Sequence, residues 1–492
     1  MDYSSLKSGT DIRGIASSLG GKEVNLTNEA VYDITAAFVS WYVNKFSAKP
    51  SDLLIAVGHD SRITGEEISK NVKQAIVNAG ATVLDCALAS TPAMFMTTVD
   101  LHADAAIQIT ASHHPFDRNG LKFFTRNGGL DSSDINEIVE LANNGEEIIS
   151  NCAGVTVEVN FMAIYAARLR RMICEAVGKG EEEKPLTNYK IVVDAGNGAG
   201  GFYAKRVLEP LGADITGSQF LEPDGMFPNH IPNPENEQAM ASICKAVKDN
   251  NADLGLIFDT DVDRAGCVGS DGEEINRNRL IALAAHIAVE GRKGAYIVTD
   301  SVTSDGLKKF IETDLGGVHY RYRRGYKNVI NKAIELKAEG KDCPLAIETS
   351  GHAALEENYF LDDGAYLVTK IVIELAKGTD INKLLETLEQ PLEAKEIRFN
   401  IKADDFKSYG LKVIEELEEY AKTVEGYTIA DDNREGIRVS TPNGWFLLRL
   451  SVHDPVMPMN FESNVEGGVQ KDIDDLKEFF KRFTELDISA MD

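Results

Sequence analysis

The chain has 492 residues, a formal net charge of −27, and 43% hydrophobic and 26% charged residues. This length exceeds what one hydrophobic core holds, so we expect three or four folded domains, and the composition is that of globular domains rather than disordered chain. The negative charge argues against nucleic acid or an anionic membrane as partner, because both attract positive surfaces. The chain shows no signal-type apolar segment at its start, no membrane-length apolar run and no CxxC pair among its six cysteines, which favours the cytoplasm.

Apolar runs alternate with amphipathic stretches along most of the chain. A helix is predicted over 29–46, because Val31, Ile34, Phe38 and Trp41 fall on one helical face. Strands that run into polar turns rich in glycine or serine are expected within 53–62, 191–200 and 295–306. This alternation predicts α/β layers around mostly parallel sheets.

A second set of predicted strands ends in loops rich in hydroxyls, carboxylates and histidines. These segments are 105–115, 254–264 and 344–352. In open α/β sheets, ligands bind at the carboxyl ends of the strands. The pattern therefore predicts three similar α/β domains, each giving one loop to a shared cleft.

The last part of the chain has a different pattern. Antiparallel strands are expected at 396–402, 436–440 and 444–450, with a hairpin turn at 442–444, and an amphipathic helix is expected at 471–486. This part is predicted to be an α+β domain. The expected domains are 1–155, 156–268, 269–391 and 392–492.

The loop at 110–115 presents Ser112 directly after a buried-type strand, followed by His113 and His114. A serine beside histidines is typical of nucleophilic catalysis, and its hydroxyl can carry a phosphoryl group. The G-x-S-x-G pattern of acyl hydrolases is absent, since Ala111 and His113 flank the serine. This loop is therefore expected to serve phosphoryl chemistry rather than acyl transfer.

The loop at 259–264 places Asp259, Asp261 and Asp263 at alternate positions. Such closely spaced carboxylates repel one another unless a cation lies between them, and hard oxygen ligands suit Mg²⁺. A calcium EF-hand is excluded, because Arg264 and Ser270 stand where that motif requires glycine and glutamate. A rival interpretation is an aspartyl-phosphate enzyme, since the segment resembles the nucleophile motif of haloacid dehalogenase-like enzymes, although that motif usually opens its domain.

Four loops together resemble the α-D-phosphohexomutase superfamily, of the phosphomannomutase/phosphoglucomutase type. They are TASHHPFDRNGLKFF (110–124), DTDVDR (259–264), ETSGH (348–352) and RLSVHDP (449–455). Supporting segments are TDIRG (10–14), VGHDSRITG (57–65), DAGNGAGG (194–201), PDGMFPNHIPNP (223–234) and LDDGAY (361–366). The resemblance covers nearly the whole chain in family order. It implies three similar mixed α/β domains and a C-terminal α+β domain around a central cleft.

The resemblance also implies a reaction. An intramolecular phosphotransferase would interconvert hexose 1-phosphate and hexose 6-phosphate, of glucose and mannose, through phosphorylated Ser112. Glucose 1,6-bisphosphate would be the intermediate and activator. Mg²⁺ would be bound by Asp259, Asp261, Asp263 and a phosphoserine oxygen. The expected partners are small sugar phosphates in carbohydrate metabolism, and the expected state is a monomer or homodimer.

The resemblance assigns roles to further residues. Arg13, Lys122 and Arg264 would neutralise the transferring phosphoryl group, Lys122 also being a candidate general base. His113 and His352 would assist proton transfer. Glu348 and Ser350 would bind sugar hydroxyls, whereas Asn119 and Gly120 would shape the serine loop.

The non-transferring phosphate would bind at the loop 449–455. Arg449 and Ser451 match an arginine-x-serine pattern, and Lys327, with Arg324, is a second basic contact or a solvated helix start. His453 and Asp454 stand where the family usually has threonine and glutamate. Because histidine gains charge below neutrality, we expect phosphate binding to be more pH-sensitive than in relatives.

Three alternatives remain open at this point. Phosphoglucosamine mutase is the nearest, because its sugar loop is similar. An aspartyl-phosphate phosphatase or phosphotransferase would instead carry phosphate on Asp259. A sugar-phosphate-binding protein without turnover would bind the same ligands but isomerise none.

Overall fold

The computed structural model describes residues 2–451 and 454–492, and His453 lies outside this range. The chain divides into two compact units: Met1–Leu280 with Ser350–Lys383, and Ile281–Thr349 with Leu384–Asp492. Within the described residues, no helix has the length and apolar character that a bilayer crossing requires.

The first unit begins with a mixed sheet of eight strands. Its order is β1-β2-β6-β5-β3-β4-β8, with β7 paired to β6. The strands are β1 (Lys7–Ser8), β2 (Asp11–Ile15), β3 (Leu54–His59), β4 (Thr82–Leu88), β5 (Ala105–Ile109), β6 (Arg118–Thr125), β7 (Gly128–Gly129) and β8 (Thr156–Glu158). The central strands β5, β3, β4 and β8 pair in parallel, whereas β1, β2 and β6 are antiparallel to their neighbours.

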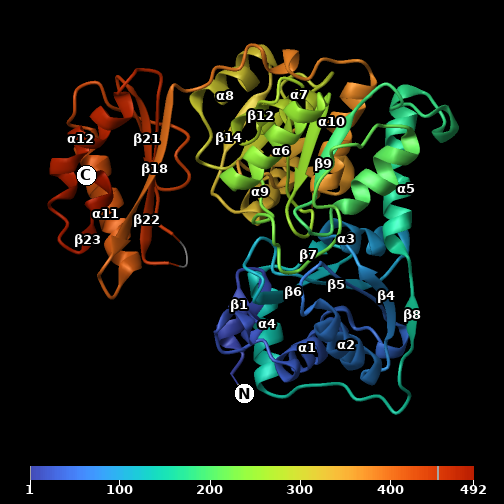
Figure 1. Ribbon diagram of the computed structural model, residues 1–492. Helices are drawn as coiled ribbons and strands as arrows, with labels where there is room; N and C mark the ends of the chain where they lie inside the picture. The colour runs from blue at the N-terminus through green and yellow to red at the C-terminus, as the bar shows by residue number, and fades with distance from the viewer. Residues whose placement is uncertain (1, 452–453) are drawn as a thin grey trace. The chain divides into compact units, whose positions relative to one another are not determined.

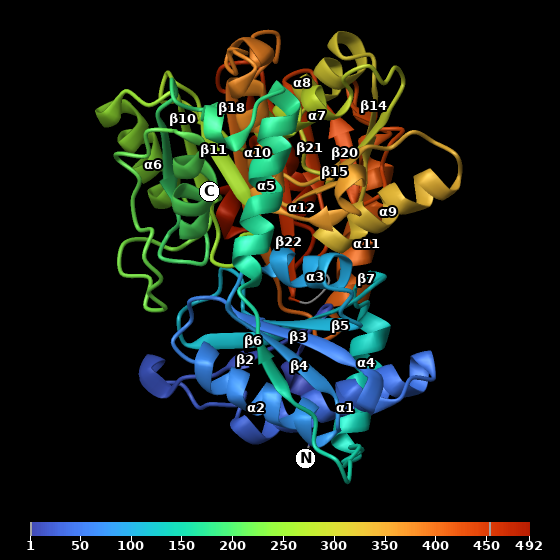
Figure 2. The same ribbon diagram turned by 90° about the vertical axis from the view of Figure 1, so that its right-hand side faces the viewer.

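Helices cover both faces of this sheet. They are α1 (Asn28–Phe46), α2 (Gly65–Asn78), α3 (Thr91–Asp100) and α4 (Ser132–Asn143). Helices α1 and α2 lie on one face and α3 on the other (Figures 1 and 2). The predicted apolar face of α1 is confirmed, because Ile34 and Phe38 are fully buried and the Phe38 ring stacks on Phe123 of β6 at 4.6 Å.

A second, four-stranded sheet in the same unit carries the aspartate loop. Its order is β12-β11-β10-β9, made of β9 (Ile191–Asp194), β10 (Leu254–Phe258), β11 (Ala265–Val268) and β12 (Glu274–Ile275), with α6 (Glu237–Asn250) packed on β10. Among the four named strands of this sheet, as the described residues form it, β9 and β10 pair in parallel, whereas β11 is antiparallel to both β10 and β12. The expectation of mostly parallel sheets is therefore wrong here. The six residues 259–264 between β10 and β11 are too few for a crossover, so the chain reverses into an antiparallel pair.

Four further elements of the first unit lie around this sheet. Helix α5 (Phe161–Val177) packs against α10 (Gly364–Ala376), and α10 also packs on β11. Strands β16 (Ala353–Leu355) and β17 (Leu361–Asp362) form an antiparallel pair directly before α10. Segments far apart in sequence thus flank the aspartate loop.

The second unit contains a parallel layer and the C-terminal domain. Strands β14 (Val318–Arg321), β13 (Tyr296–Thr299) and β15 (Leu345–Ile347) pair in parallel in that order. The accompanying helices are α8 (Asp305–Lys309) and α9 (Tyr326–Ala338), while α7 (Asn278–Ala288) runs across the boundary of the two units. This layer agrees with the predicted strand at 295–306.

The C-terminal domain is a six-stranded antiparallel sheet with two helices on it (Figure 1). The order β19-β20-β21-β22-β18-β23 is made of β18 (Glu393–Ile401), β19 (Thr428–Ile429), β20 (Ile437–Ser440), β21 (Gly444–Leu448), β22 (Val456–Ser463) and β23 (Leu486–Asp487). The helices are α11 (Phe406–Ala421) and α12 (Gly468–Phe480). The hairpin predicted around 442–444 is confirmed, because Ser440 pairs with Trp445.

The last helix differs from its predicted bounds of 471–486. It begins at Gly468 and ends at Phe480. Leu486 belongs instead to β23, where it pairs with Ile401 of β18. Leu486 therefore extends the sheet rather than the helix. The four-domain division remains a prediction.

Candidate active site

Ser112 lies at the carboxyl end of β5, where the chain leaves the centre of the first sheet. Its side chain is buried, with 4% exposure, and its backbone has a left-handed φ of 51°. A serine rarely adopts this conformation, and strained residues of this kind concentrate at functional sites. The amide of Ser112 donates to Thr110 Oγ1 at 2.9 Å, which helps to fix the turn.

The Ser112 hydroxyl faces the aspartate loop of the second sheet. Its Oγ donates to Asp259 Oδ2 at 3.3 Å and accepts from Arg264 Nη2 at 3.1 Å. His113 Nδ1 is 3.4 Å from the same oxygen. The structure thus brings together residues that are about 150 positions apart in the sequence, as the two loops predict.

The aspartate loop is held in a strained form. Val262 has a φ of 67°, which is a true outlier for a β-branched residue, and it is fully buried. Its carbonyl accepts from the Gly364 amide at the start of α10. A Cβ on Gly364 would lie 2.7 Å from the Arg264 carbonyl carbon, so only glycine allows α10 to approach the loop this closely.

Asp261 is anchored by the first residue of α3. Its carbonyl accepts from the Thr91 amide at 2.8 Å, and its Oδ2 accepts a short hydrogen bond from the Thr91 hydroxyl. The helix N-terminus therefore supports a carboxylate on the second sheet. Sequence reasoning missed Thr91, although Ser90-Thr91-Pro92 is a recognisable helix start.

The buried charges of the loop are distributed unevenly. Burial, and then the nearby Asp263 carboxylate, raise the pKa of Asp259 well above its usual range despite the contact with Arg264. Burial also acts to raise the pKa of Asp263, but Lys122, His352 and Arg264 outweigh it and lower this pKa. The loop is thus electrostatically strained around Asp259, which a cation would relieve.

Lys122 comes from β6 and reaches the same carboxylates. Its Nζ donates to Asp263 Oδ2 at 2.5 Å and lies 3.6 Å from Asp261 Oδ2. Arg13, on the neighbouring β2, is paired in register with Gly120 and donates to Asp11 at 2.7 Å. Both predicted basic side chains, Lys122 and Arg13, therefore belong to the neighbouring strands β6 and β2, beside the serine loop.

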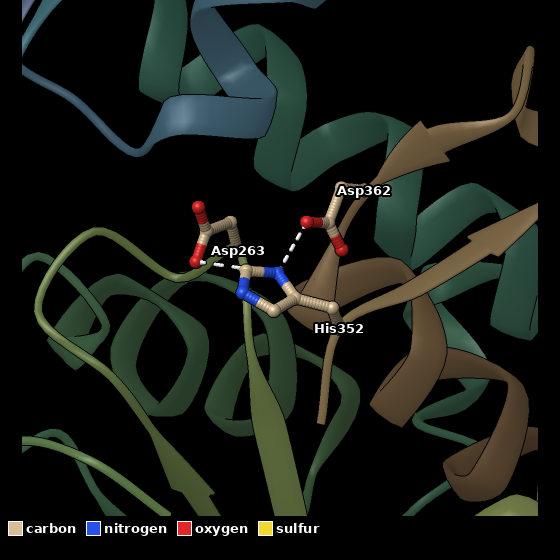
Figure 3. Close-up of side chains that lie close together, drawn as sticks. All are labelled: Asp263, His352 and Asp362. Atoms are coloured by element: carbon tan, nitrogen blue, oxygen red, sulfur yellow. Dashed lines mark hydrogen bonds and ion pairs between the residues drawn. The ribbon is translucent and has the colours of Figure 1, made fainter. Parts of the chain in front are cut away.

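His352 lies between two carboxylates, as Figure 3 shows. Its Nδ1 makes a short hydrogen bond to Asp362 Oδ2 and is 4.0 Å from Asp263 Oδ1. Burial opposes the charged ring, but Asp362 and Asp263 raise the pKa of His352 to about 9. The ring is therefore protonated at neutral pH and can donate a proton. Asp362 was missed from the sequence, although it lies in the segment LDDGAY.

His113 has the opposite electrostatic surroundings. Burial, followed by the charge of Arg264, lowers the pKa of His113 to about 2. The ring is thus neutral near Ser112 and stacks on the His114 ring at 5.1 Å. A general base is most effective with a pKa near the working pH, so this geometry favours hydrogen bonding over proton abstraction. The assignment of His113 to proton transfer remains a prediction.

The three aspartates suit a divalent cation. One oxygen from each of Asp259, Asp261 and Asp263 lies within 4.8 Å of the others. The Oδ1 atoms of Asp261 and Asp263 are buried, and among the described residues they have no hydrogen-bond partner. Unsatisfied buried carboxylate oxygens fit a hard cation such as Mg²⁺.

The predicted sugar-binding residues are buried. Glu348, after β15, accepts from the Gly325 amide at 2.6 Å, while the hydroxyl of Ser350 is buried and lacks a partner within the described part of the chain. Lys327 is half-buried in the first turn of α9. A buried polar atom without a partner is where a ligand hydroxyl gains most.

The predicted phosphate loop follows β21. Arg449 is buried, with its Nη2 3.4 Å from Asn460 Oδ1 and 3.7 Å from Glu396 Oε2. The Ser451 hydroxyl accepts from the Asp454 amide at 3.2 Å. His453 lies outside the described residues, so its predicted effect on phosphate binding has no structural account.

Comparisons with known proteins support the family that these loops resemble. The chain matches the family models of phosphoglucomutase/phosphomannomutase α/β/α domains I, II and III over residues 6–148, 168–272 and 276–392. It is 30% identical to a phosphomannomutase/phosphoglucomutase of Pseudomonas aeruginosa, over 94% of this chain and 92% of that protein. It is 29% identical to a phosphoglucomutase of Neisseria gonorrhoeae, over 94% and 93% of the two chains.

A solved structure of a phosphoglucomutase/phosphomannomutase family protein from Burkholderia thailandensis is also similar. The TM-score is 0.80 at 25% identity, covering 100% of this chain and 99% of the other. The match thus extends through the C-terminal domain. Together with the three matched domains, it shows that this chain belongs to the phosphoglucomutase/phosphomannomutase family of the α-D-phosphohexomutase superfamily.

Proposed function

We propose that this chain interconverts hexose 1-phosphates and hexose 6-phosphates, with glucose and mannose phosphates as substrates. The observation that carries the proposal is the buried Ser112 hydroxyl, held between Arg264 and Asp259 at the edge of the three-aspartate loop. Family membership supports an isomerase of this kind, and the relatives described above are named for glucose and mannose phosphates.

Phosphoryl transfer would occur in two halves. In the first, the bond between phosphorus and Ser112 Oγ breaks and a new bond forms to the free hydroxyl oxygen of the sugar monophosphate. The hydroxyl proton passes to a base, and a hexose 1,6-bisphosphate results. In the second half, the other phosphoryl group returns to Ser112, leaving the isomeric monophosphate. Added glucose 1,6-bisphosphate would phosphorylate a dephosphorylated enzyme by this second half.

The chain's own residues supply the electrostatics. Arg264 donates to Ser112 Oγ and would hold a phosphoryl group there, while Lys122 and Arg13 would add positive charge. His352, protonated at neutral pH, would donate a proton. Lys122, the candidate base, would accept the hydroxyl proton in its uncharged form and become positively charged as it does so. Asp259, Asp261, Asp263 and a phosphoserine oxygen would hold Mg²⁺, which neutralises charge on the transferring group.

The remaining contacts would position the substrate. Glu348 and Ser350 would hydrogen-bond the sugar hydroxyls. Arg449, Ser451, His453 and Lys327 would bind the phosphate that is not being transferred. In this arrangement the reacting hydroxyl would lie at the Ser112 loop. Either end of the bisphosphate could then react, because the same residues would bind whichever phosphate is not being transferred.

The test is a coupled mutase assay with Mg²⁺ and catalytic glucose 1,6-bisphosphate. It compares glucose 1-phosphate, mannose 1-phosphate and glucosamine 1-phosphate as substrates, with Ser112→Ala as the control. We expect similar kcat/KM for the first two and a loss of at least about 10³-fold in the variant, because the phosphoryl carrier is gone. Phosphopeptide mass spectrometry should find acid-stable phosphate on Ser112.

Other outcomes would change the assignment. A clear preference for glucosamine 1-phosphate would identify a phosphoglucosamine mutase. Hydroxylamine-labile phosphate on Asp259 would identify an aspartyl-phosphate enzyme instead. Binding of all three sugars without isomerisation would identify a binding protein.

A further inference from the structure

Arg62 makes an unusual set of contacts beneath the serine loop. This residue follows β3, and its guanidinium is fully buried. Nη1 donates to the carbonyls of Pro115 at 2.7 Å and Arg118 at 2.8 Å, and Nη2 donates to those of Ser112 at 2.5 Å and His114 at 2.6 Å. One side chain therefore ties together four carbonyls of the segment 112–118.

The charge of Arg62 is balanced inside the same cluster. Its Nε is 3.3 Å from Asp60 Oδ2, and both side chains are inaccessible to solvent. That carboxylate oxygen also accepts from the Thr110 hydroxyl at 2.6 Å, and Thr110 Oγ1 accepts from the Ser112 amide. Ser112 is thus held on both sides, through its carbonyl by Arg62 and through its amide by Thr110.

This support explains how the strained turn persists. Ser112 has a φ of 51°, and a non-glycine residue in this region needs surroundings that over-determine its conformation. Without Arg62, the buried carbonyl of Ser112 and the half-buried carbonyls of His114 and Arg118 would lose the donor that they share, which is unfavourable. The Pro115 carbonyl would keep the Arg118 amide as a donor. The guanidinium therefore selects the turn in which Ser112 Oγ reaches Arg264 and Asp259.

The loop that contains Gly225 and Phe227 covers the buried pair of Arg62 and Asp60. The Phe227 ring lies 5.4 Å from the Arg62 guanidinium carbon. Gly225 packs on the backbone of 61–63, where an added Cβ would lie 2.4 Å from the Ile63 amide nitrogen. Glycine is thus required for this close approach, and the contact shields the buried charge from water.

We propose that Arg62 is a positioning residue for phosphoryl transfer, which orients Ser112 through the loop backbone. The inference rests on the proposed function for its kinetic consequence. Arg62 makes none of the described contacts to Ser112 Oγ, so its effect must pass through the carbonyls that it holds. Misplacement of a reacting group by about 1 Å can lower a rate by about 10²-fold.

The main test compares Arg62→Lys and Arg62→Ala with the wild type. Lysine keeps the charge opposite Asp60 but cannot span four carbonyls. We expect kcat to fall about 10²-fold, while KM for glucose 1-phosphate stays within about twofold, because the substrate contacts are elsewhere. Added guanidinium at low millimolar concentration should restore part of kcat in Arg62→Ala.

A matched control is Arg126→Ala. Arg126 also donates to two loop carbonyls, those of His102 and Ala103, and pairs with Asp104 in the same unit. Its contacts lie at the other end of β5 from Ser112. We expect kcat to remain at the wild-type value in this variant. Comparing the Arg62 variants with Arg126→Ala distinguishes the general effect of losing an arginine that binds backbone carbonyls from the specific effect of losing Arg62.

Hydrogen exchange of the peptide 110–118 gives a readout that needs no turnover. Arg62→Lys should exchange these amides at least about tenfold faster, and Arg126→Ala should leave them unchanged. If the Arg62 variants do not fold, Thr110→Val removes the other support of Ser112 and should lower kcat with KM retained.

Either of two results would overturn the inference. The first is wild-type kcat together with unchanged exchange in a folded Arg62→Lys. The second, which applies if the Arg62 variants do not fold, is wild-type kcat in Thr110→Val. A wild-type protein without mutase activity would overturn the proposed function instead. In that case faster exchange in Arg62→Lys still supports the loop-positioning role.

Discussion

At the residue scale, the pair of His352 and Asp362 gives the site a pH-dependent proton donor. The pKa of His352 is about 9 because Asp362 and Asp263 outweigh the effect of burial. In Asp362→Asn, the Ala353 amide keeps an acceptor while the negative charge is lost. We therefore expect the pKa of His352 to fall toward its ordinary value, near 6.5.

Histidine ring NMR of the metal-free protein measures this shift, with His352→Gln identifying the resonance. The alkaline limb of kcat/KM should move to lower pH in Asp362→Asn, because the ring loses its proton earlier as pH rises. His230, paired with Asp194 at 3.0 Å, serves as an internal control whose resonance should not move. An unchanged His352 midpoint would show that Asp362 does not set its charge.

Single residues also show which parts of the site can be predicted from the sequence. Ser112, Asp259, Asp261 and Asp263 were predicted as one site because each lies in a contiguous motif at the end of a strand. Contacts such as Thr91 to Asp261 join residues 170 positions apart, and no local pattern marks them. Such partners become visible only when the sheets are placed together.

At the scale of elements, the N-terminus of α3 supports the aspartate loop. Thr91 contributes both an amide and a hydroxyl to Asp261. Thr91→Val keeps the shape and the amide but removes the hydroxyl, leaving Asp261 Oδ2 without that donor. We expect the Mg²⁺ concentration for half-maximal activity to rise about tenfold, in line with the effect of residues that orient metal ligands.

Thr91→Ser is the matched control, because it keeps the hydroxyl and should retain wild-type Mg²⁺ dependence. A direct Mn²⁺ titration followed by electron paramagnetic resonance would test binding without turnover. Equal Mn²⁺ affinity in the valine and serine variants would mean that the hydroxyl does not orient Asp261.

The elements themselves were largely predictable, whereas their pairing was not. The strands after Leu53, Lys190 and Ala295 and the helix at 29–46 follow from apolar periodicity. The antiparallel return of β11 and the extension of the last sheet by Leu486 depend on which strand is available as a neighbour. Local periodicity carries no information about that choice.

At the scale of the whole molecule, distant segments of the first unit meet at buried polar contacts. Asp363 caps α10 by accepting from the Tyr366 amide, and the Tyr165 hydroxyl of α5 donates to its carboxylate at 2.7 Å. The two helices are about 200 residues apart in the chain, so neither the contact nor its burial was predicted. The three boundaries between the four expected domains likewise remain predictions.

Burial raises the pKa of Asp363 to about 6, above its usual value of 3.8. Between these pH values the folded state binds more protons than the unfolded state, so this group's contribution to stability falls as pH rises. The full effect is ~3 kcal/mol at most, from about 1.4 kcal/mol for each pKa unit. Asp363→Asn keeps an acceptor for the helix cap but has no charge, so its stability should lack this slope.

Thermal unfolding at pH 4.5, 6 and 7.5 would measure the effect. The midpoint of the wild type, relative to Asp363→Asn, should decrease as pH rises through 6. Tyr165→Phe should extend this decrease to higher pH, since the lost hydrogen bond had favoured the ionised carboxylate. If the wild type instead gained stability over Asp363→Asn as pH rose, Asp363 would be a stabilising anion, and the α5–α10 contact would be an ionic rather than a neutral link.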